Sequence, residues 1–153
     1  HLKDKIQIYG KTPNRELMAR LAKANALLLF NDYILAGTKI FDYLSLQRQI
    51  VLCYSSDMFG DSFTRPYADR ITPGQFPNLQ ENIISETQSG VIARDPEHFE
   101  SIITQCIEQH KIHGEIKISS KNTEIYSRQH QTQKLATIIH KILEEKSSEK
   151  SNI

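Results

Sequence analysis

The residues best suited to chemistry lie in a glycine-led segment, Gly37-Thr38-Lys39, which begins an expected helix over residues 38–47. Free backbone N–H groups and the helix dipole make the start of a helix a binding point for anions. Asp42 follows Thr38 by four positions, so both side chains share one helix face, about 6 Å apart along the axis. A ligand with an anion at the helix start and a hydroxyl-bearing ring beside Asp42 would be a nucleotide. Its diphosphate would bind to the N–H groups and its ribose to the carboxylate. The alternative interpretation is a Thr38 N-cap and a solvated acid.

A second candidate binding segment is the turn Tyr9-Gly10-Lys11, which follows an expected strand over residues 6–9. In open α/β sheets, ligands bind beyond the carboxyl ends of the strands, where loops lead into helices. Gly10 lets a backbone approach closely, and Tyr9 offers a flat face to a base. The alternative interpretation is a tight turn with an aromatic residue at its rim.

Other kinds of site have no matching pattern in the sequence. His110 and His113 are three residues apart, but no cysteine or acidic cluster joins them, so we expect no metal site. No Gly-x-Ser-x-Gly motif or Cys/His pair indicates a covalent nucleophile, so the sequence assigns no catalytic residue. The P-loop spacing Gly-x4-Gly-Lys-Ser/Thr is also absent.

The pattern of apolar residues predicts the elements that position these segments. Alternation and short apolar runs predict strands over residues 6–9, 26–30, 49–54, 83–84 and 90–93. Helix-start signals and apolar spacings of three and four predict helices that begin at Thr12-Pro13, with Thr12 as N-cap, at Thr38, at Asp95-Pro96 and at Tyr126. Strands alternating with helices predict an α/β fold with a largely parallel sheet.

The chain is expected to form one domain over residues 1–146, followed by a disordered tail over 147–153. The last helix, 126–146, carries one apolar stripe: Leu135, Ile138, Ile139, Ile142 and Leu143. An irregular segment, 57–78, contains scattered aromatic residues, which favour a packed loop over a disordered linker. The chain starts at His1 and leads almost directly into a strand pattern, so we expect a piece of a longer protein.

Composition excludes several functions for the 153 residues. Lysine and arginine number 19 against 18 acidic residues, and the basic residues are spread out, so no nucleic-acid or polybasic membrane-binding patch is expected. The longest apolar run, Ala26 to Phe30, is far shorter than the roughly 20 residues that span a bilayer. Cys53 and Cys106 lie in apolar runs, which indicates buried free thiols in a reducing compartment.

Several segments also resemble sequence motifs of a known family. They are residues 6–10, 16–29, 38–45, 49–52, 90–99 and 126–128. Residues 38–45 are similar to a "Lys-Leu-Phe-Glu-Tyr-Leu-Ala" helix, and residues 90–95 to a "Gly-Leu-Val-x-x-Asp" strand. In this order and spacing, the segments resemble the carboxyl-terminal domain of GT-B glycosyltransferases, closest to the retaining, family-four-like branch of bacterial envelope enzymes. The resemblance covers about residues 5–56 and 79–145.

The resemblance implies a Rossmann-like, three-layer domain with a mostly parallel sheet, cut short at its amino-terminal side, that binds a UDP- or GDP-linked sugar. In the family, the acid at the Asp42 position binds ribose hydroxyls, backbone groups at positions 37–39 meet the diphosphate, and the turn at 9–11 lies against the base. Asp42 stands where the family usually has Glu. The family's basic pair that neutralises the diphosphate lies upstream of the strand ending at Gly10.

The implied reaction transfers a hexose to a saccharide or lipid-linked acceptor in polysaccharide biosynthesis, with no bound metal or other cofactor. An amino-terminal domain of the same protein would supply the acceptor site, so the isolated chain is expected to be inactive. The implied location is the cytoplasm, with at most peripheral contact with the inner membrane face. Two alternatives stay open: a sugar-nucleotide epimerase of the same architecture, and a non-catalytic α/β interaction module whose contact surface is the loop 57–78.

Overall fold

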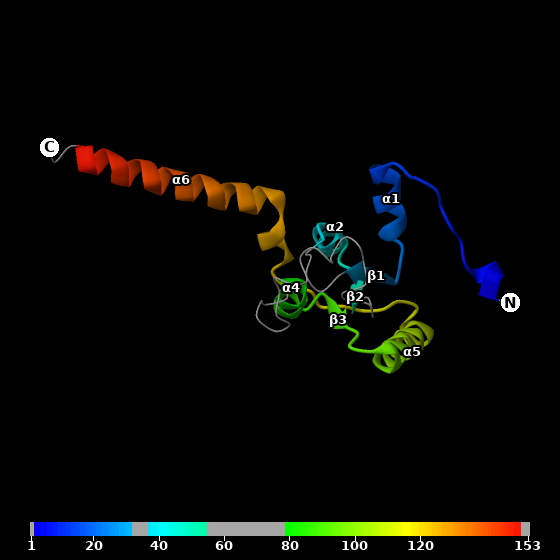
Figure 1. The fold of residues 1–153 in the computed structure, drawn as a ribbon. Helices are drawn as coiled ribbons and strands as arrows, with labels where there is room; N and C mark the ends of the chain where they lie inside the picture. Colours follow the sequence, from blue (N-terminus) through cyan, green and yellow to red (C-terminus); the bar gives the residue numbers. More distant parts are fainter. Residues whose placement is uncertain (1, 32–36, 55–78, 151–153) are drawn as a thin grey trace, which may run out of the picture.

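The computed structural model describes residues 2–31, 37–54 and 79–150. Three strands, β1 (Ala26–Asn31), β2 (Gln49–Tyr54) and β3 (Gly90–Ile92), form a parallel sheet in the order β1-β2-β3 (Figure 1). The α-helices of the described residues are α1 (Asn14–Leu21), α2 (Lys39–Leu46), α4 (Leu79–Thr87), α5 (Pro96–His113) and α6 (Arg128–Lys150). Two short 3-10 helices are η1 (Leu2–Lys5) and η2 (Thr123–Tyr126). The predicted mixed α/β class with a parallel sheet is confirmed. The predicted loop 57–78 lies outside the described residues.

The central strand, β2, is buried on both faces, which explains its nearly continuous apolar sequence. Side chains alternate between the two faces of a strand, so Ile50 and Leu52 face one side and Val51 and Cys53 the other. The two sets belong to two separate hydrophobic clusters. The sheet is therefore covered on both faces.

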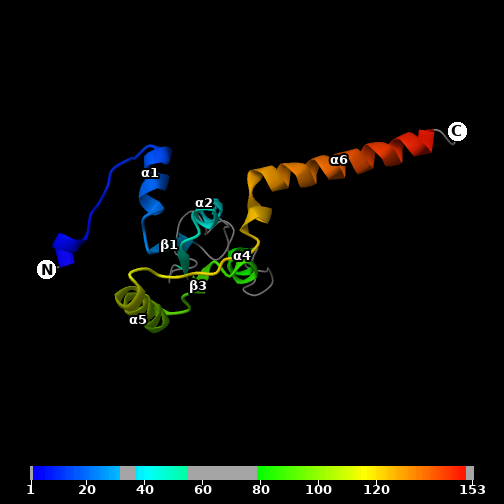
Figure 2. The same cartoon turned by 180° about the vertical axis from the view of Figure 1, so that it is seen from behind.

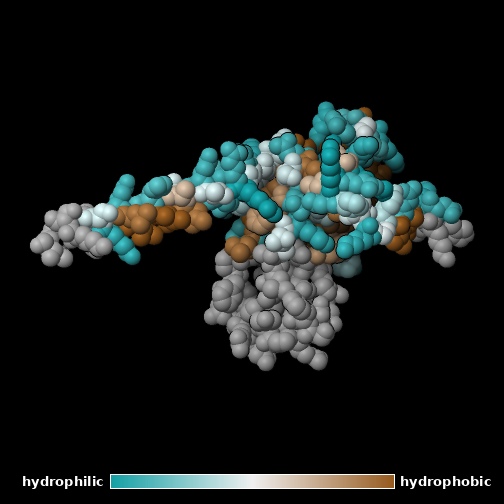
Figure 3. Space-filling model, turned by 90° about the horizontal axis from the view of Figure 1, so that it is seen from above, coloured by the Kyte–Doolittle hydropathy of each residue, from teal (hydrophilic) through white to brown (hydrophobic). Residues whose placement is uncertain are grey.

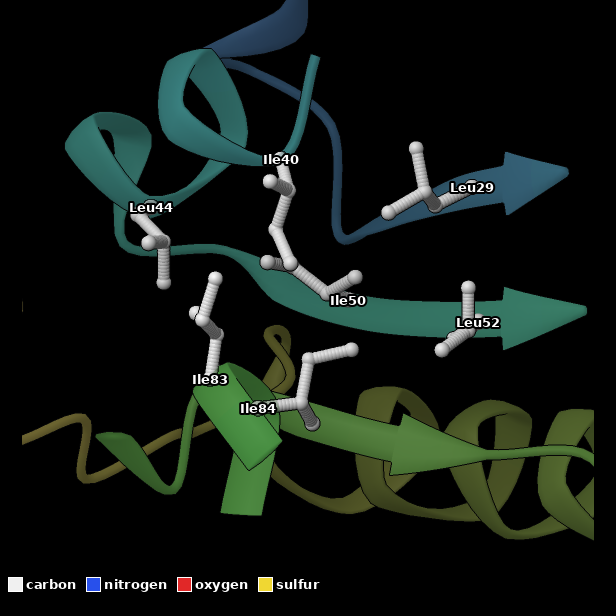
Figure 4. Packing of buried hydrophobic residues seen from close by; sticks show 7 residues of the cluster. All are labelled: Leu29, Ile40, Leu44, Ile50, Leu52, Ile83 and Ile84. Carbon is white, nitrogen blue, oxygen red and sulfur yellow. The ribbon is translucent and has the colours of Figure 1, made fainter. Parts of the chain in front are cut away.

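The first cluster joins the sheet to α2 and α4. Its buried members are Leu29, Ile40, Leu44, Ile50, Leu52, Ile83 and Ile84. Figure 4 shows the side chains of α2 and α4 converging on Ile50 from two sides. Because Ile40 and Leu44 are four residues apart, a single face of α2 supplies both contacts.

The second cluster joins the opposite face of the sheet to α5. Val51 and Cys53 of β2 are buried there against Ala93 and Ile102. The helix α5 begins where expected, because the Asp95 carboxylate accepts a hydrogen bond of 2.6 Å from the His98 N–H and Pro96 opens the first turn. The result is three layers, with α2 and α4 on one side of the sheet and α5 on the other.

The predicted strand over residues 6–9 is wrong. These residues form no strand, and Ile8 is 93 % exposed. An alternating pattern makes a strand only where a neighbouring strand accepts its backbone hydrogen bonds, and β1 pairs only with β2 among the described residues. The predicted Thr12 N-cap is also wrong: Pro13 holds that position, and the Thr12 hydroxyl donates to the Gly10 carbonyl instead.

The predicted strand at Ile83-Ile84 is also wrong, because both residues lie in α4. Leu79, Ile83 and Ile84 have spacings that fit one side of a helix as well as they fit a short strand. Burial decides the outcome: Ile83 and Ile84 both face the core from α4, and the buried Thr87 hydroxyl donates to the Ile83 carbonyl at 2.6 Å.

The last helix differs from its prediction in both bounds and packing. It begins at Arg128 rather than Tyr126 and runs to Lys150, so residues 147–150 of the predicted disordered tail are helical, while 151–153 lie outside the described residues. Figures 1 and 2 show α6 extending away from the sheet, on the side opposite α1. Its predicted apolar stripe is exposed rather than part of the core. None of the helices in the described ranges has the length and apolar character needed to cross a membrane.

Candidate functional site

A surface cavity of about 710 Å³ lies between α2 and the start of α6. Four of its lining residues come from α2 and its N-cap, and four from the end of η2 and the first turn of α6. They are Thr38, Phe41, Asp42 and Ser45 on the first wall and Tyr126, Ser127, Arg128 and Gln131 on the second. Segments about 80 residues apart in the sequence thus meet at one site.

The first wall follows directly from helical periodicity. Thr38, Asp42 and Ser45 occur at intervals of four and three residues, so they lie on one face of α2. The opposite face, with Ile40 and Leu44, packs into the core and fixes which side of the helix is open. The predicted shared face of Thr38 and Asp42 is therefore confirmed.

The second wall is held in place by Tyr126. Its ring packs against the first hydrophobic cluster and lies 6.3 Å, centroid to centroid, from the ring of Phe41. Its hydroxyl donates a hydrogen bond of 2.7 Å to the Glu86 carboxylate on α4. Burial raises the pKa of Tyr126, and the hydrogen bond to Glu86 and its negative charge act in the same direction. These contacts anchor η2 to α2 and α4 and so position the first turn of α6.

Two helix N-termini border this cavity. Thr38 is the N-cap residue of α2, but its side chain makes no capping hydrogen bond with the helix. On the other wall, the Ser127 hydroxyl accepts a hydrogen bond of 3.2 Å from the His130 N–H, and Arg128 begins α6. The positive ends of two helix dipoles and one guanidinium therefore act on the same space, which favours an anion.

Asp42 gives the cavity an acceptor beside this electropositive region. Its side chain is exposed, and its backbone carbonyl accepts a hydrogen bond of 2.6 Å from the Ser45 hydroxyl. Burial raises the pKa of the neighbouring Tyr43, and the negative charge of Asp42 raises it further. A carboxylate accepts hydrogen bonds and does not donate them, so Asp42 suits a ligand with hydroxyl donors.

The remaining predicted site residues do not line this cavity. Gly37 is half-buried and Lys39 is exposed, on either side of Thr38. The segment 9–11 lies beyond α1, on the far side of α2 from η2 (Figure 1).

Within that segment, the contacts are local. The Arg20 guanidinium lies 4.2 Å above the centre of the Tyr9 ring, and the Tyr9 hydroxyl donates to the Gln7 side chain. A Cβ added to Gly10 would have no neighbour within 4 Å, so no close backbone approach requires the glycine. Tyr9, Gly10 and Lys11 are therefore not brought together with Thr38 and Asp42 in this structure.

Sequence reasoning missed the contributions of Arg128 and Gln131. One signal was present: a cation in the first turn of a helix opposes the helix dipole, so Arg128 stands where a purely structural choice favours an acid. The residues that line the cavity together with Arg128 could not be predicted, because their position depends on how η2 packs against α2.

Among the described residues, no group of three or more His, Cys, Asp or Glu side chains is placed to hold a metal ion. Cys53 is buried and Cys106 partly buried, and both are free thiols, in line with the sequence prediction. Comparisons with models of known protein families, with curated proteins and with solved structures found no significant match to this chain.

Proposed function

We propose that this chain is the donor-binding half of a GT-B glycosyltransferase and that a nucleoside diphosphate binds in the cavity between α2 and α6. The observation that carries the proposal is the meeting of Asp42 and Arg128 in one cavity bordered by two helix N-termini. This combination supplies an acceptor for hydroxyls and a cationic region for phosphates. The helical layers on both faces of a parallel sheet are compatible with the Rossmann-like domain of that family.

The diphosphate is assigned to the cationic side of the cavity. The Arg128 guanidinium donates to phosphate oxygens, and the first N–H groups of α2 add uncharged donors. Gln131 lies one turn after Arg128 on the same wall; its Nε2 donates one hydrogen bond of 2.6 Å to the Ile125 carbonyl, and the second N–H of the amide can donate to the ligand. Arg128 thus takes the place of the cations that the family carries upstream of the segment corresponding to residues 6–10.

The ribose is assigned to Asp42. Its carboxylate accepts hydrogen bonds from the two ribose hydroxyls, while the exposed ring of Phe41 forms an apolar wall beside it. Asp42 has one methylene fewer than the usual Glu, so the sugar must approach α2 more closely than it does in relatives with Glu.

In the proposed reaction, the bond between the sugar carbon and the diphosphate oxygen breaks, and a bond from that carbon to an acceptor oxygen forms. The departing diphosphate takes the electron pair of the broken bond and accepts the hydroxyl proton of the acceptor, which an amino-terminal domain of the same protein would hold. This chain stabilises the negative charge that develops on the departing diphosphate, which is an electrostatic contribution. The acceptor is a saccharide or a lipid-linked saccharide.

Calorimetric titration of the chain tests the proposal. UDP and GDP are compared with uridine and guanosine, which keep the ribose and base but lack the phosphates. We expect weak binding of at least one diphosphate and no measurable binding of the nucleosides. Equal binding of nucleoside and nucleotide, or no binding of either nucleotide at millimolar concentration, would contradict the proposal.

A further inference from the structure

The cavity between α2 and α6 adjoins a second, smaller cavity of about 230 Å³ between the end of α2 and η2. The two cavities share the lining residues Phe41, Ser45, Tyr126 and Ser127. The second cavity is also lined by Leu44 and Gln47 from the end of α2 and by Thr123 and Glu124 from η2. A ligand bound in the first cavity can therefore extend past Ser45 into the second.

The order of residues along α2 matches the order of the parts of a nucleoside diphosphate. Thr38 lies at the start of the helix, to which the diphosphate is assigned, and Asp42, the acceptor for the ribose, follows about 6 Å along the axis. Gln47 is the C-cap residue, about 7.5 Å beyond Asp42. The base therefore falls to the second cavity. The turn 9–11, which the family resemblance assigns to the base, lies on the far side of α2 from η2.

Charge is divided between the two cavities in the same order. Arg128 lines only the first cavity, and Glu124 lines only the second. The Glu124 carboxylate is exposed and makes no ion pair or hydrogen bond with the residues that the structure describes. Because a carboxylate accepts hydrogen bonds and does not donate them, a base beside Glu124 must present donors.

The second cavity offers an apolar surface and two polar side chains. The flat face of a base can stack on the apolar surface that Phe41 and Leu44 supply, while Glu124 accepts hydrogen bonds and the Gln47 amide donates one at its edge. Among the common bases, only guanine carries two adjacent N–H donors, N1–H and the 2-amino group, beside a carbonyl oxygen, O6. Uracil has one N–H between two carbonyl oxygens. Adenine and cytosine each have one amino group beside a ring nitrogen that accepts.

We propose that the second cavity binds the base of the nucleotide and selects guanine, so that the sugar donor is GDP-linked. This inference rests on the proposed function, because it extends the same site. The Glu124 carboxylate accepts hydrogen bonds from N1–H and the 2-amino group, and the Gln47 amide donates to O6. A carboxylate facing a carbonyl oxygen of uracil is repelled by it, which disfavours UDP.

The two cavities lie apart from the apolar stripe of α6. The stripe, which begins at Leu135, belongs to the hydrophobic band along the arm on the left of Figure 3. Gln131, the last residue that lines either cavity, precedes Leu135 by four positions. Gln47 and Glu124 also belong to neither core cluster. Substitutions at these two positions therefore test base binding without altering the core or the stripe.

Calorimetric titration of the full chain with GDP, UDP, ADP and inosine diphosphate tests the base assignment. Inosine diphosphate differs from GDP only in lacking the 2-amino group. We expect GDP to bind about tenfold more tightly than UDP or ADP, because only guanine satisfies both oxygens of the carboxylate. Inosine diphosphate should bind several-fold more weakly than GDP.

Two substitutions identify the groups responsible. Glu124→Gln should lower the affinity for GDP about tenfold without lowering that for UDP, and should reduce the difference between GDP and inosine diphosphate. Glu108→Gln removes the same charge from the exposed surface of α5 and should change neither affinity. Gln47→Gly removes the amide at a position whose φ of 50° favours glycine, so the affinity for GDP should fall with no loss of thermal stability.

Equal affinity for GDP, UDP and ADP, or tighter binding of UDP or ADP, would overturn the selection of guanine and leave the diphosphate site of the proposed function standing. A preference for GDP that persists unchanged in Glu124→Gln would overturn the second cavity as the site of the base. Absence of binding by every diphosphate at millimolar concentration would overturn this inference and the proposed function together.

Discussion

Asp42 on α2 and Arg128, the first residue of α6, line one cavity although two of the three strands, β2 and β3, lie between them in sequence. The relationship depends on Tyr126, whose ring packs against Phe41 and whose hydroxyl bonds to Glu86. Both side chains are exposed and belong to neither core cluster, so both are accessible to a ligand.

The role assigned to Arg128 predicts a loss of phosphate affinity when its charge is removed. Arg128→Gln should weaken UDP or GDP binding about tenfold, because a charge-assisted hydrogen bond contributes about 1.5–3 kcal/mol. Lys134→Gln, which removes an equal charge from α6 outside the cavity, should change affinity less than twofold. Calorimetry measures both. Equal effects of the two substitutions would show that Arg128 acts only through net charge.

The role assigned to Asp42 predicts a specific interaction with ribose hydroxyls. The original chain should bind UDP or GDP more tightly than the corresponding 2′-deoxynucleotide, by about five- to tenfold. In Asp42→Asn the difference should shrink, because the neutral amide is a weaker acceptor than the carboxylate. This double comparison isolates the contact between Asp42 and the 2′-hydroxyl. An unchanged preference for ribose in Asp42→Asn would contradict the assignment.

The close approach of β2 and β3 predicts strong destabilisation by Gly90→Ala. An added Cβ would lie 2.0 Å from the Ile50 carbonyl oxygen, so one strand must shift. We expect a loss of about 2 kcal/mol in the free energy of unfolding, as for other overpacked cores. Gly10→Ala serves as the control, since its Cβ meets nothing within 4 Å. Denaturant unfolding of the two variants gives the comparison, and a Gly90→Ala chain as stable as Gly10→Ala would argue against the β2–β3 pairing.

The environment of Tyr126 predicts a stability loss at alkaline pH. Its pKa in the folded chain is raised above 10.0 by burial and by Glu86, so the folded state keeps a proton that the unfolded state loses above pH 10. The stabilisation is fully present below pH 10 and disappears as the pH rises through the folded-state pKa. Tyr126→Phe removes this titration, so its stability should fall less steeply above pH 10.

Below pH 10, Tyr126→Phe also loses the hydrogen bond to Glu86, which we expect to cost about 1 kcal/mol. Tyr9→Phe removes a hydroxyl from an exposed residue away from either core cluster and is the matched control. Chemical unfolding at a series of pH values measures both effects. A Tyr126→Phe chain with the same alkaline slope as the original would contradict the contribution of Tyr126.

The sequence predicts the parts of this fold in which local pattern and burial agree. The β2 strand is an apolar run buried on both faces of the sheet, and Asp95-Pro96 carries its own capping signal, so neither needs knowledge of distant contacts. The β1 strand is also an apolar run, but only Leu27 and Leu29 are buried, while Phe30 is 65 % exposed. The strand predictions for residues 6–9 and for Ile83-Ile84 are wrong because a short apolar pattern does not specify whether the segment pairs with a neighbouring strand or packs as part of a helix.

The candidate site was likewise predictable only where local spacing determines it. Thr38 and Asp42 share a face by helical spacing alone, and the structure keeps that relation. Arg128 is joined to them by Tyr126, which packs on Phe41 and bonds to Glu86; these contacts between distant segments are encoded by no local pattern. The exposure of the α6 stripe could not be predicted from the sequence either, because the spacing of its apolar residues is the same whether or not that face packs on the core of the chain.

The most direct test of a nucleotide site between α2 and α6 is a titration of the isotope-labelled chain with UDP and GDP, followed residue by residue by NMR. Such a site predicts that the amide signals of Thr38, Asp42, Arg128 and Gln131 shift together and saturate with one dissociation constant. Signals that stay fixed at millimolar nucleotide, or that move only elsewhere, such as at residues 9–11, would contradict it.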